Sequence, residues 1–184
     1  MTKKNKLIIY LLSAAVILFC VIRFWAIPAR EARQEEYTVN QTDALTHDMS
    51  VIKDFKNSYV GNVSNTTHLF YSLPLCNIPM KFQIDSDTCA LTVNYLDTVW
   101  NIGEEKVQRD LIYNSVAAMA AIDNLSKITY AFSGDTYSFD RKQLEEIFGS
   151  PLSKLLERER WVSEVRDKLS SSEFCQQFYK SQSQ

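Results

Sequence analysis

The chain opens with an apolar run longer than any that follows it. Residues 7–22 carry no charge, and residues 23–27 (Arg-Phe-Trp-Ala-Ile) extend the run to about 21 residues. A helix of that length rises about 31 Å, which is enough to cross the hydrocarbon core of a bilayer. The pattern therefore predicts a transmembrane helix over residues 7–27.

Charges at the two ends of this run predict its orientation. Basic residues precede it and no acidic residue occurs in residues 1–30, so the positive-inside rule places residues 1–6 in the cytoplasm. At the far end, a guanidinium can reach the headgroups while two aromatic rings lie at the interface. The residues expected to set membrane orientation and interface are Lys3, Lys4, Lys6, Arg23, Phe24 and Trp25.

Two other interpretations of the N-terminal run remain open. A cleaved export signal also has a basic start and an apolar stretch, but the small residues Ala26 and Ala29 come only after a bulky pair. An uncleaved anchor is therefore the favoured interpretation. A lipid-modified cysteine would need a small residue just before it, whereas Cys20 follows Leu18 and Phe19, so Cys20 is interpreted as an apolar helix residue.

Polar residues then separate the run from the remainder of the chain. Residues 28–41 are charged and polar with no apolar period, which predicts a juxtamembrane spacer able to continue the helix. Residues 42–184 are long enough for one domain with its own core. Apolar residues at helical spacing predict two short helices at its start, ending before Pro74.

Alternating apolar and polar positions predict two β-hairpins in this domain. Residues 80–85 and 90–96 alternate around a polar turn at residues 85–88. Residues 127–132 and 136–139 alternate around Ser-Gly-Asp at 133–135. Between the hairpins, Asn101 and Glu104 form a capping-box pattern that predicts a long helix over residues 103–125.

Residues typical of helix starts and ends follow the second hairpin. Asp140 is a predicted helix cap, Gly149 a predicted helix end, and Pro151 the predicted start of the next helix. Apolar spacing continues to Leu169, and a short amphipathic tail follows. The pattern predicts an α+β domain of ββαββα order, with two hairpins in an antiparallel sheet and helices mostly on one face.

Charge and cysteine content narrow the functional classes. Four of the 20 basic residues precede residue 28, which leaves 16 against 22 acidic residues in the outer part, a net charge of about −6. An acidic surface repels phosphate backbones, so nucleic acid is not an expected partner. Cys76, Cys89 and Cys175 are an odd set, and the first two lie at opposite ends of the predicted hairpin, which disfavours a disulfide.

No catalytic, cofactor or metal site is predicted. His47 and His68 lack the spacing and the cysteine partners of a zinc site. Ser50 and Lys53 match an S-x-x-K pattern whose companion motifs are missing, so we interpret the match as coincidence. Turn, cap and solvated-face roles explain six carboxylates near the first hairpin and long helix, namely Asp85, Asp87, Asp97, Glu104, Glu105 and Asp110.

Several short motifs carry a resemblance to a known family. They are Tyr-Val-Gly-Asn-Val-Ser at 59–64 leading to Leu-Pro at 73–74, Leu-Thr-Val-Asn-Tyr at 91–95, Ala-Ile-Asp-Asn at 121–124, and Phe-Gly at 148–149. Across residues 53–169 the chain resembles an uncharacterised extracytoplasmic family of Gram-positive bacteria, the domain of unknown function 4825. The resemblance implies a membrane-tethered module in signalling or envelope interaction, sometimes near sensor-type membrane peptidases. The family has no assigned catalytic residues to carry over.

The functional expectation follows from the anchor. We expect a non-enzymatic binding or sensing module in the cell membrane, with its N-terminus cytoplasmic and its domain extracytoplasmic. Its expected partners are the lipid bilayer and a membrane protein or envelope ligand. About six cytoplasmic residues are too few for a signalling domain, so any signal would pass through that partner. A carboxylate-dependent envelope hydrolase using Asp97 and Glu104, and a purely structural envelope protein, are the alternatives.

Overall fold

The chain consists of two compact units. The computed structural model describes residues 3–182, and the side chains of residues 4–5 and 10–180. The first unit ends at Val39 and the second begins at Asn40. Each unit is described by itself below.

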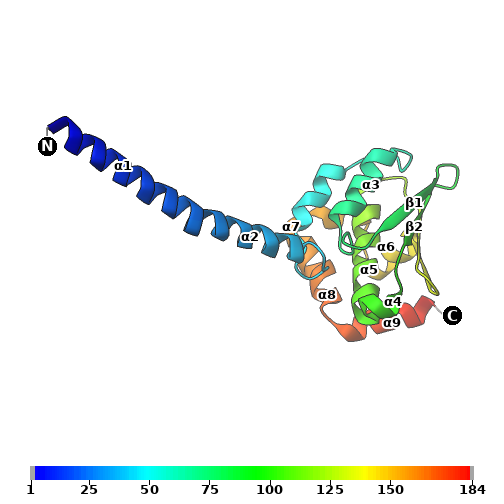
Figure 1. Ribbon diagram of the computed structural model, residues 1–184. Helices are drawn as coiled ribbons and strands as arrows, with labels where there is room; N and C mark the ends of the chain where they lie inside the picture. The colour runs from blue at the N-terminus through cyan, green and yellow to red at the C-terminus, as the bar shows by residue number, and fades with distance from the viewer. Residues whose placement is uncertain (1–2, 183–184) are drawn as a thin grey trace. The chain divides into compact units, whose positions relative to one another are not determined.

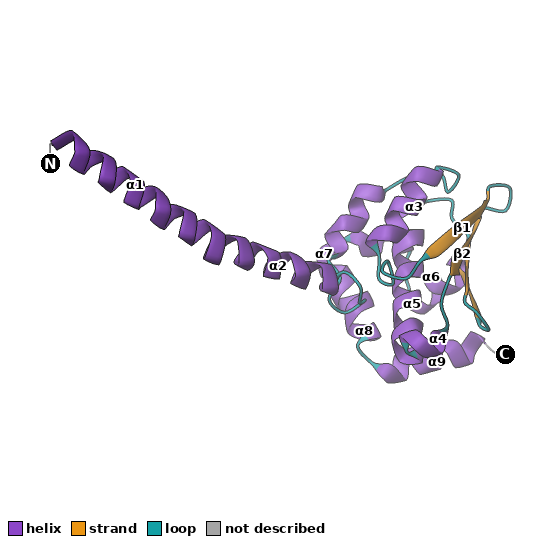
Figure 2. Ribbon diagram, viewed as in Figure 1, coloured by secondary structure: helices purple, strands orange, loops and turns teal. Residues whose placement is uncertain are grey.

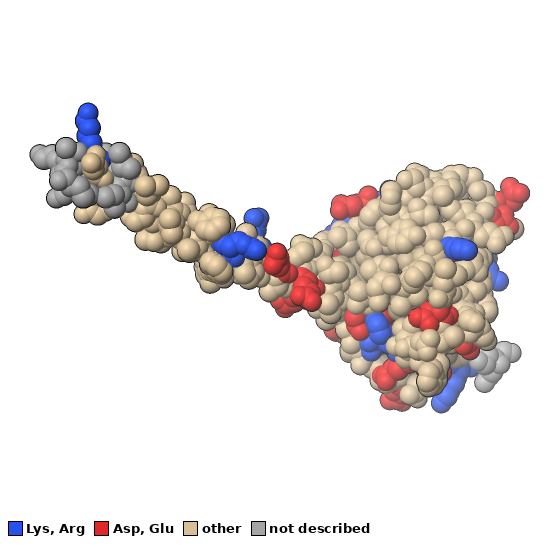
Figure 3. Space-filling view, in the orientation of Figure 1, with Lys and Arg blue, Asp and Glu red and all other residues tan. Residues whose placement is uncertain are grey.

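The first unit is one continuous helix with a widened turn (Figure 1). It comprises α1 (Lys3–Val21), the π-helical turn η1 (Ile22–Ala26) and α2 (Ile27–Asn40), which ends in the second unit. The 31 residues Tyr10–Asn40 are long and apolar enough to cross a membrane, a test that an export signal near an N-terminus also passes. Figure 3 shows an uncharged stretch between a basic side chain near the start of this helix and charged side chains in its second half.

Short helices precede the sheet of the second unit. The 3-10 helix η2 (Met49–Phe55) is capped by Asp48, and α3 (Val63–Ser72) is capped by Asn62. Both helices are where the apolar spacing predicts them, although the first is narrower than an α-helix. Because they precede the strands and further helices follow, the order of elements differs from the predicted ββαββα.

Four strands form one sheet in the order β1-β2-β3-β4 (Figure 2). The strands are β1 (Met80–Asp85), β2 (Ala90–Tyr95), β3 (Lys127–Ala131) and β4 (Thr136–Asp140). Both predicted hairpins are confirmed, with antiparallel pairing of β1 with β2 and of β3 with β4. The prediction of a fully antiparallel sheet is wrong, since β2 and β3 pair in parallel. Helices joining the hairpins return the chain to the same end of the sheet before β3 begins.

Helices cover one face of this sheet. The pairing aligns one row of side chains across all four strands, in which Phe82 faces Val93, Val93 faces Tyr130 and Tyr130 faces Tyr137. This row meets α3 through Phe70, whose ring centroid lies 5.7 Å from that of Phe82. On the opposite face, the hydroxyls of Thr129 and Ser138 lie 3.1 Å apart at an exposed position. The predicted one-sided packing of helices is therefore observed.

The central helix of the core is shorter than predicted. The segment between the hairpins forms α4 (Val99–Ile102) and α5 (Glu104–Ala121), separated by Gly103 at φ +103°. A positive φ of that size suits glycine because it has no Cβ. Asn101 does not cap α5, because it lies within α4 and its side-chain amide donates to Asp97. Most of α5 is buried, including its alanine-rich stretch at 117–121.

The C-terminal segment completes the cover of α5. It comprises α6 (Arg141–Phe148), η3 (Leu152–Leu156), α7 (Arg158–Arg160), the π-helix η4 (Trp161–Arg166), α8 (Asp167–Leu169) and α9 (Ser172–Gln182). Asp140 caps α6 and Gly149 ends it at φ +65°, as predicted. Pro151 precedes η3 as its cap instead of occupying its first turn, and the single predicted helix to Leu169 is broken into short pieces.

Candidate binding surface

The predicted membrane-interface residues lie on the widened turn of the first unit. Arg23, Phe24 and Trp25 belong to η1 and are exposed. Lys4 is exposed at the start of α1, whereas the side chains of Lys3 and Lys6 lie outside the described ones. A π-turn directs successive side chains differently from an α-turn, so η1 changes which residues share a face at this point.

Most of the candidate carboxylates have the local roles that the sequence predicts. Asp85 accepts the amides of Asp87 and Thr88 in the hairpin turn, which lowers its pKa. The side-chain amide of Asn101 and the Thr98 amide lower the pKa of Asp97 in the same way. Glu104 and Glu105 begin α5, where acidic side chains favour the helix dipole. In the described part of the chain no three His, Cys, Asp or Glu side chains converge as a metal site.

Asp110 is the exception, and its predicted turn, cap or solvated role is wrong. Its side chain is 0% exposed and accepts from the Ala44 amide at 3.0 Å and from Lys106. Burial raises the pKa of Asp110, and Lys106 opposes that rise. Burial also acts on Asp43, but the Leu45 amide and Arg109 outweigh it, so the pKa of Asp43 lies below its ordinary value. The four charges attach the start of the domain to α5.

His47 is buried and fully hydrogen-bonded. Its Nε2 lies 2.7 Å from the carbonyl oxygen of Ser72, which can only accept, so Nε2 carries the proton. Its Nδ1 then accepts from the Tyr113 hydroxyl at 2.8 Å. Burial lowers the pKa of His47, so the ring is neutral at pH 7. His47 is therefore a hydrogen-bonded residue of the core.

Residues in and beside the motifs that resemble the family have structural roles. The Asn124 side chain accepts from the Val60 amide at 2.7 Å, and the Asn57 backbone bridges the chain just after α5. Thr66 donates its hydroxyl to the Val60 carbonyl at 3.0 Å. These bonds hold the loop before α3 against the end of α5. Asn124 also donates to the Cys89 thiol at 3.3 Å, and the four cysteines are free in the structure.

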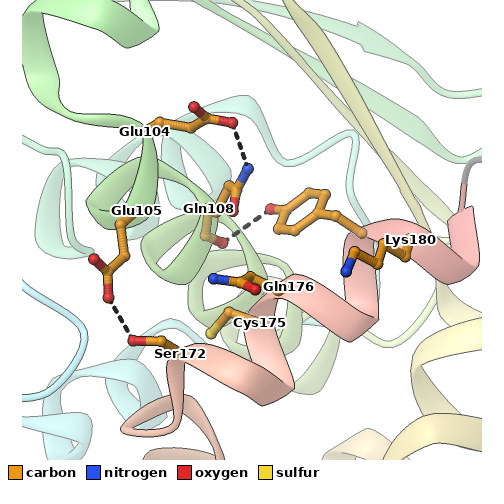
Figure 4. Close-up of a pocket in the computed structure, with 8 residues that line it drawn as sticks. Glu104, Glu105, Gln108, Ser172, Cys175, Gln176 and Lys180 are labelled. Atoms are coloured by element: carbon orange, nitrogen blue, oxygen red, sulfur yellow. Dashed lines mark hydrogen bonds between the residues drawn. The ribbon is translucent and has the colours of Figure 1, made fainter.

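An open groove of about 590 Å³ lies between α5 and α9 (Figure 4). Its floor is held by two hydrogen bonds between these helices. Ser172 donates to Glu105 at 2.6 Å, and the Tyr179 hydroxyl donates to the Gln108 carbonyl at 2.9 Å. The ionisable residues lining it are Glu104, Glu105, Cys175, Tyr179 and Lys180. The pKa of neighbouring Tyr137 is raised by burial and then by the negative charges of Asp135 and Glu104.

Two exposed apolar side chains, here called the apolar knob, precede α5, whose first residues line this groove. Trp100 on α4 is 89% exposed and Leu96 just before α4 is 59% exposed. Four residues separate Trp100 from Glu104, so their Cα atoms are at most about 14 Å apart. Capping by Thr98 and the bonds to Asp97 fix the geometry of α4. The knob and the acidic groove together form the candidate binding surface, which sequence reasoning missed.

Fold and surface define a mixed α+β domain that follows an apolar N-terminal helix. Residues 52–142 match the family model described as Domain of unknown function (DUF4825). This part of the chain is therefore a member of that family, as the motifs at 59–64, 91–95 and 121–124 indicate. No curated protein and no solved structure matches the chain significantly. The matched region is shorter than the predicted 53–169 and does not include the Phe-Gly pair at 148–149.

Proposed function

We propose that this protein is a non-enzymatic binding module of the cell membrane, anchored by residues 7–27, with the domain outside and the first six residues in the cytoplasm. The exposed Trp100 beside the acidic groove is the observation that supports the binding role. A large aromatic side chain held in water by a capped helix is typical of interaction hot spots. The Gram-positive origin implied by the family resemblance remains a prediction.

The charges around the knob favour one kind of partner. Glu104, Glu105 and nearby Asp97 outnumber Lys180 on this surface. Carboxylates attract basic segments, and the Trp100 ring can take a guanidinium or ammonium on its face. The same charges repel an anionic bilayer surface. The proposed partner is thus a basic segment of a membrane or envelope protein, through which any signal would pass.

The hydrolase alternative receives less support from the local contacts. Asp97 is occupied by the Thr98 amide and the Asn101 side chain, and Glu104 accepts from Gln108 at 3.0 Å. A general acid and base pair needs two carboxylates directed toward a shared substrate position. Asp97 is instead bonded to the start of α4, and Glu104 is bonded within α5.

A photo-crosslinking experiment tests the binding role. A benzophenone amino acid is placed at Trp100 in the full-length protein in native membranes, with Tyr59, an exposed aromatic residue on another segment, as the control position. We expect a defined adduct from position 100 that a soluble oligo-arginine peptide competes away and that Glu104→Gln/Glu105→Gln weakens. Identical adducts from positions 100 and 59, or adducts insensitive to the peptide, would contradict the proposal.

Protease protection tests the anchor separately. In intact cells the proposal expects added protease to digest the domain after Arg30 while the protein stays in the membrane fraction. A domain shielded from external protease would reverse the orientation. A shortened chain released from the membrane would instead show that the N-terminal helix is a cleaved signal.

A further inference from the structure

A second hollow in the domain has the opposite electrostatic character. It encloses about 300 Å³ between the segment at residues 46–50 and the helix formed by α7, η4 and α8. Arg158 and Arg166 line it from the helix, and Asp48 lines it from the other side. The domain is acidic overall, so a hollow lined by two guanidinium groups has a local charge opposite to the net charge of the domain.

The helix brings both arginines to the hollow. Arg158, Val162 and Arg166 follow one another at intervals of four residues and all three line the hollow. The turns between them belong largely to the π-helix η4. Single π-turns within helices occur frequently at functional sites, where they reposition side chains. Arg160, between them in sequence, instead pairs with Glu164 at 2.7 Å and does not line the hollow.

Arg166 is held in place by a hydrogen bond, and others of its N–H donors make no bond within the protein. One of its terminal nitrogens donates to the His47 carbonyl at 2.6 Å, and its buried Nε has no protein acceptor. Because this nitrogen is buried, an anion in the hollow would be contacted by the other N–H groups of the two terminal nitrogens, which make only one bond within the protein. The fully bonded His47 ring beneath keeps the carbonyl fixed.

The charge balance of the hollow also favours an anion. Asp48 accepts the Ser50 amide at 3.0 Å, and this bond, then the Ser50 hydroxyl, lower its pKa, with His47 and Arg158 contributing further. Asp48 is therefore ionised, and His47 is neutral. Two positive charges face one negative charge, which leaves a surplus of one positive charge. A bound anion would neutralise it.

We propose that this hollow is a binding site for a phosphate group, contacted by Arg158 and Arg166. Eight residues of helix separate the two Cα atoms by about 12 Å, so the guanidinium groups approach from two directions. A tetrahedral phosphate presents oxygens to both, whereas a planar carboxylate presents its pair of oxygens to one fork. The phosphate can belong to a soluble ester or to a lipid headgroup.

Titration of the full-length protein in a neutral sugar-based detergent and a phosphate-free buffer, with no phospholipid present, tests the site. Inorganic phosphate is the probe, and isothermal calorimetry measures its dissociation constant, which we expect at about 1 mM. Arg158→Gln should weaken binding about tenfold, because it removes one charged fork. Arg160→Gln is the matched control on the same helix and should leave binding within about twofold. Arg166→Gln should also weaken binding, with circular dichroism checking that its fold is kept.

Two further titrations distinguish the sources of the phosphate. Equal affinity for glycerol phosphate and for short-chain phosphatidylglycerol assigns the site to soluble esters, and a preference for phosphatidylglycerol assigns it to headgroups. Absence of phosphate binding up to about 50 mM overturns the proposal. So does equal weakening by Arg158→Gln and Arg160→Gln. Since Trp100 lies on a different element, neither result bears on the proposed partner surface.

Discussion

Arg141 donates from its guanidinium to the carbonyl oxygen of Met119 at 2.7 Å, which joins the first residue of α6 to the last turn of α5. The same group also donates to the carbonyls of Ile122 at 2.7 Å and Leu125 at 2.8 Å. The final carbonyls of a helix lack intrahelical donors, so one side chain satisfies several of them at once. The second hairpin is thereby attached to the core helix.

We expect Arg141→Met to destabilise the domain by about 2–3 kcal/mol, since it removes charge-assisted bonds to buried carbonyls. Urea unfolding of the full-length protein, followed by circular dichroism, measures the change. Lys142→Met is the matched control because Lys142 is exposed on the same helix. Equal effects of the two substitutions would show that the carbonyls are satisfied without Arg141.

Stability should fall as the pH drops below about 6.5 because of His47. Burial, opposed by the Ser72 carbonyl and Asp48, lowers its folded-state pKa below that of the unfolded chain. On acidification the unfolded state binds a proton first, so the free energy of unfolding decreases, by at most about 1.4 kcal/mol per pH unit. His47→Gln should flatten this slope, while His68→Gln, at an exposed position, should retain it.

Iodide quenching should separate the tryptophans. Trp161 is fully buried against Tyr113, whereas Trp100 is exposed. In a Trp25→Phe background we expect iodide to quench about half of the emission, because one of the two remaining rings is accessible. Adding Trp100→Phe should leave emission that resists iodide. Strong quenching of that double variant would place Trp161 at the surface.

Maleimide should label the thiols in an order set by burial. Cys175 is 3% exposed and its pKa is raised by burial, so it should react only after denaturant is added. Cys89 is half-buried and should react in the folded protein. All four thiols should be titratable after unfolding without a reductant. A reductant-dependent increase in their number would reveal a disulfide.

Local patterns in the sequence predict the hairpins, caps and turns well. Alternation in residues 80–85 and the polar turn that follows depend only on neighbours, and so do the Asp140 cap and the left-handed Gly149. The parallel pairing of β2 with β3 depends on where two hairpins dock, which no local pattern specifies. The short helix α4 before Gly103 is not predicted, because Asn101 and Glu104 match a capping-box pattern that assigns Asn101 to a cap instead of a helix.

The candidate sites depend still more on tertiary contacts. Asp110 has the sequence context of a solvated helix residue, yet Ala44 and Lys106 bury it. No local pattern relates Arg158 to Arg166, and only the π-helix η4 and the segment at residues 46–50 bring both side chains to one hollow. The exposure of Trp100 does have a signal in the sequence, because a tryptophan between a cap residue and a glycine has little core to enter.

The family region ends before the residues that cover one side of α5. Residues 52–142 contain the sheet and α5, but Trp161, which packs edge-on against Tyr113 at 5.1 Å between ring centroids, lies beyond them, as does η3. Cut at residue 142, the region would leave one side of its central helix in water and would not be an autonomous folding unit. In this chain the cover of α5 comes from residues after 142, so substitutions there can unfold a family region that they do not belong to.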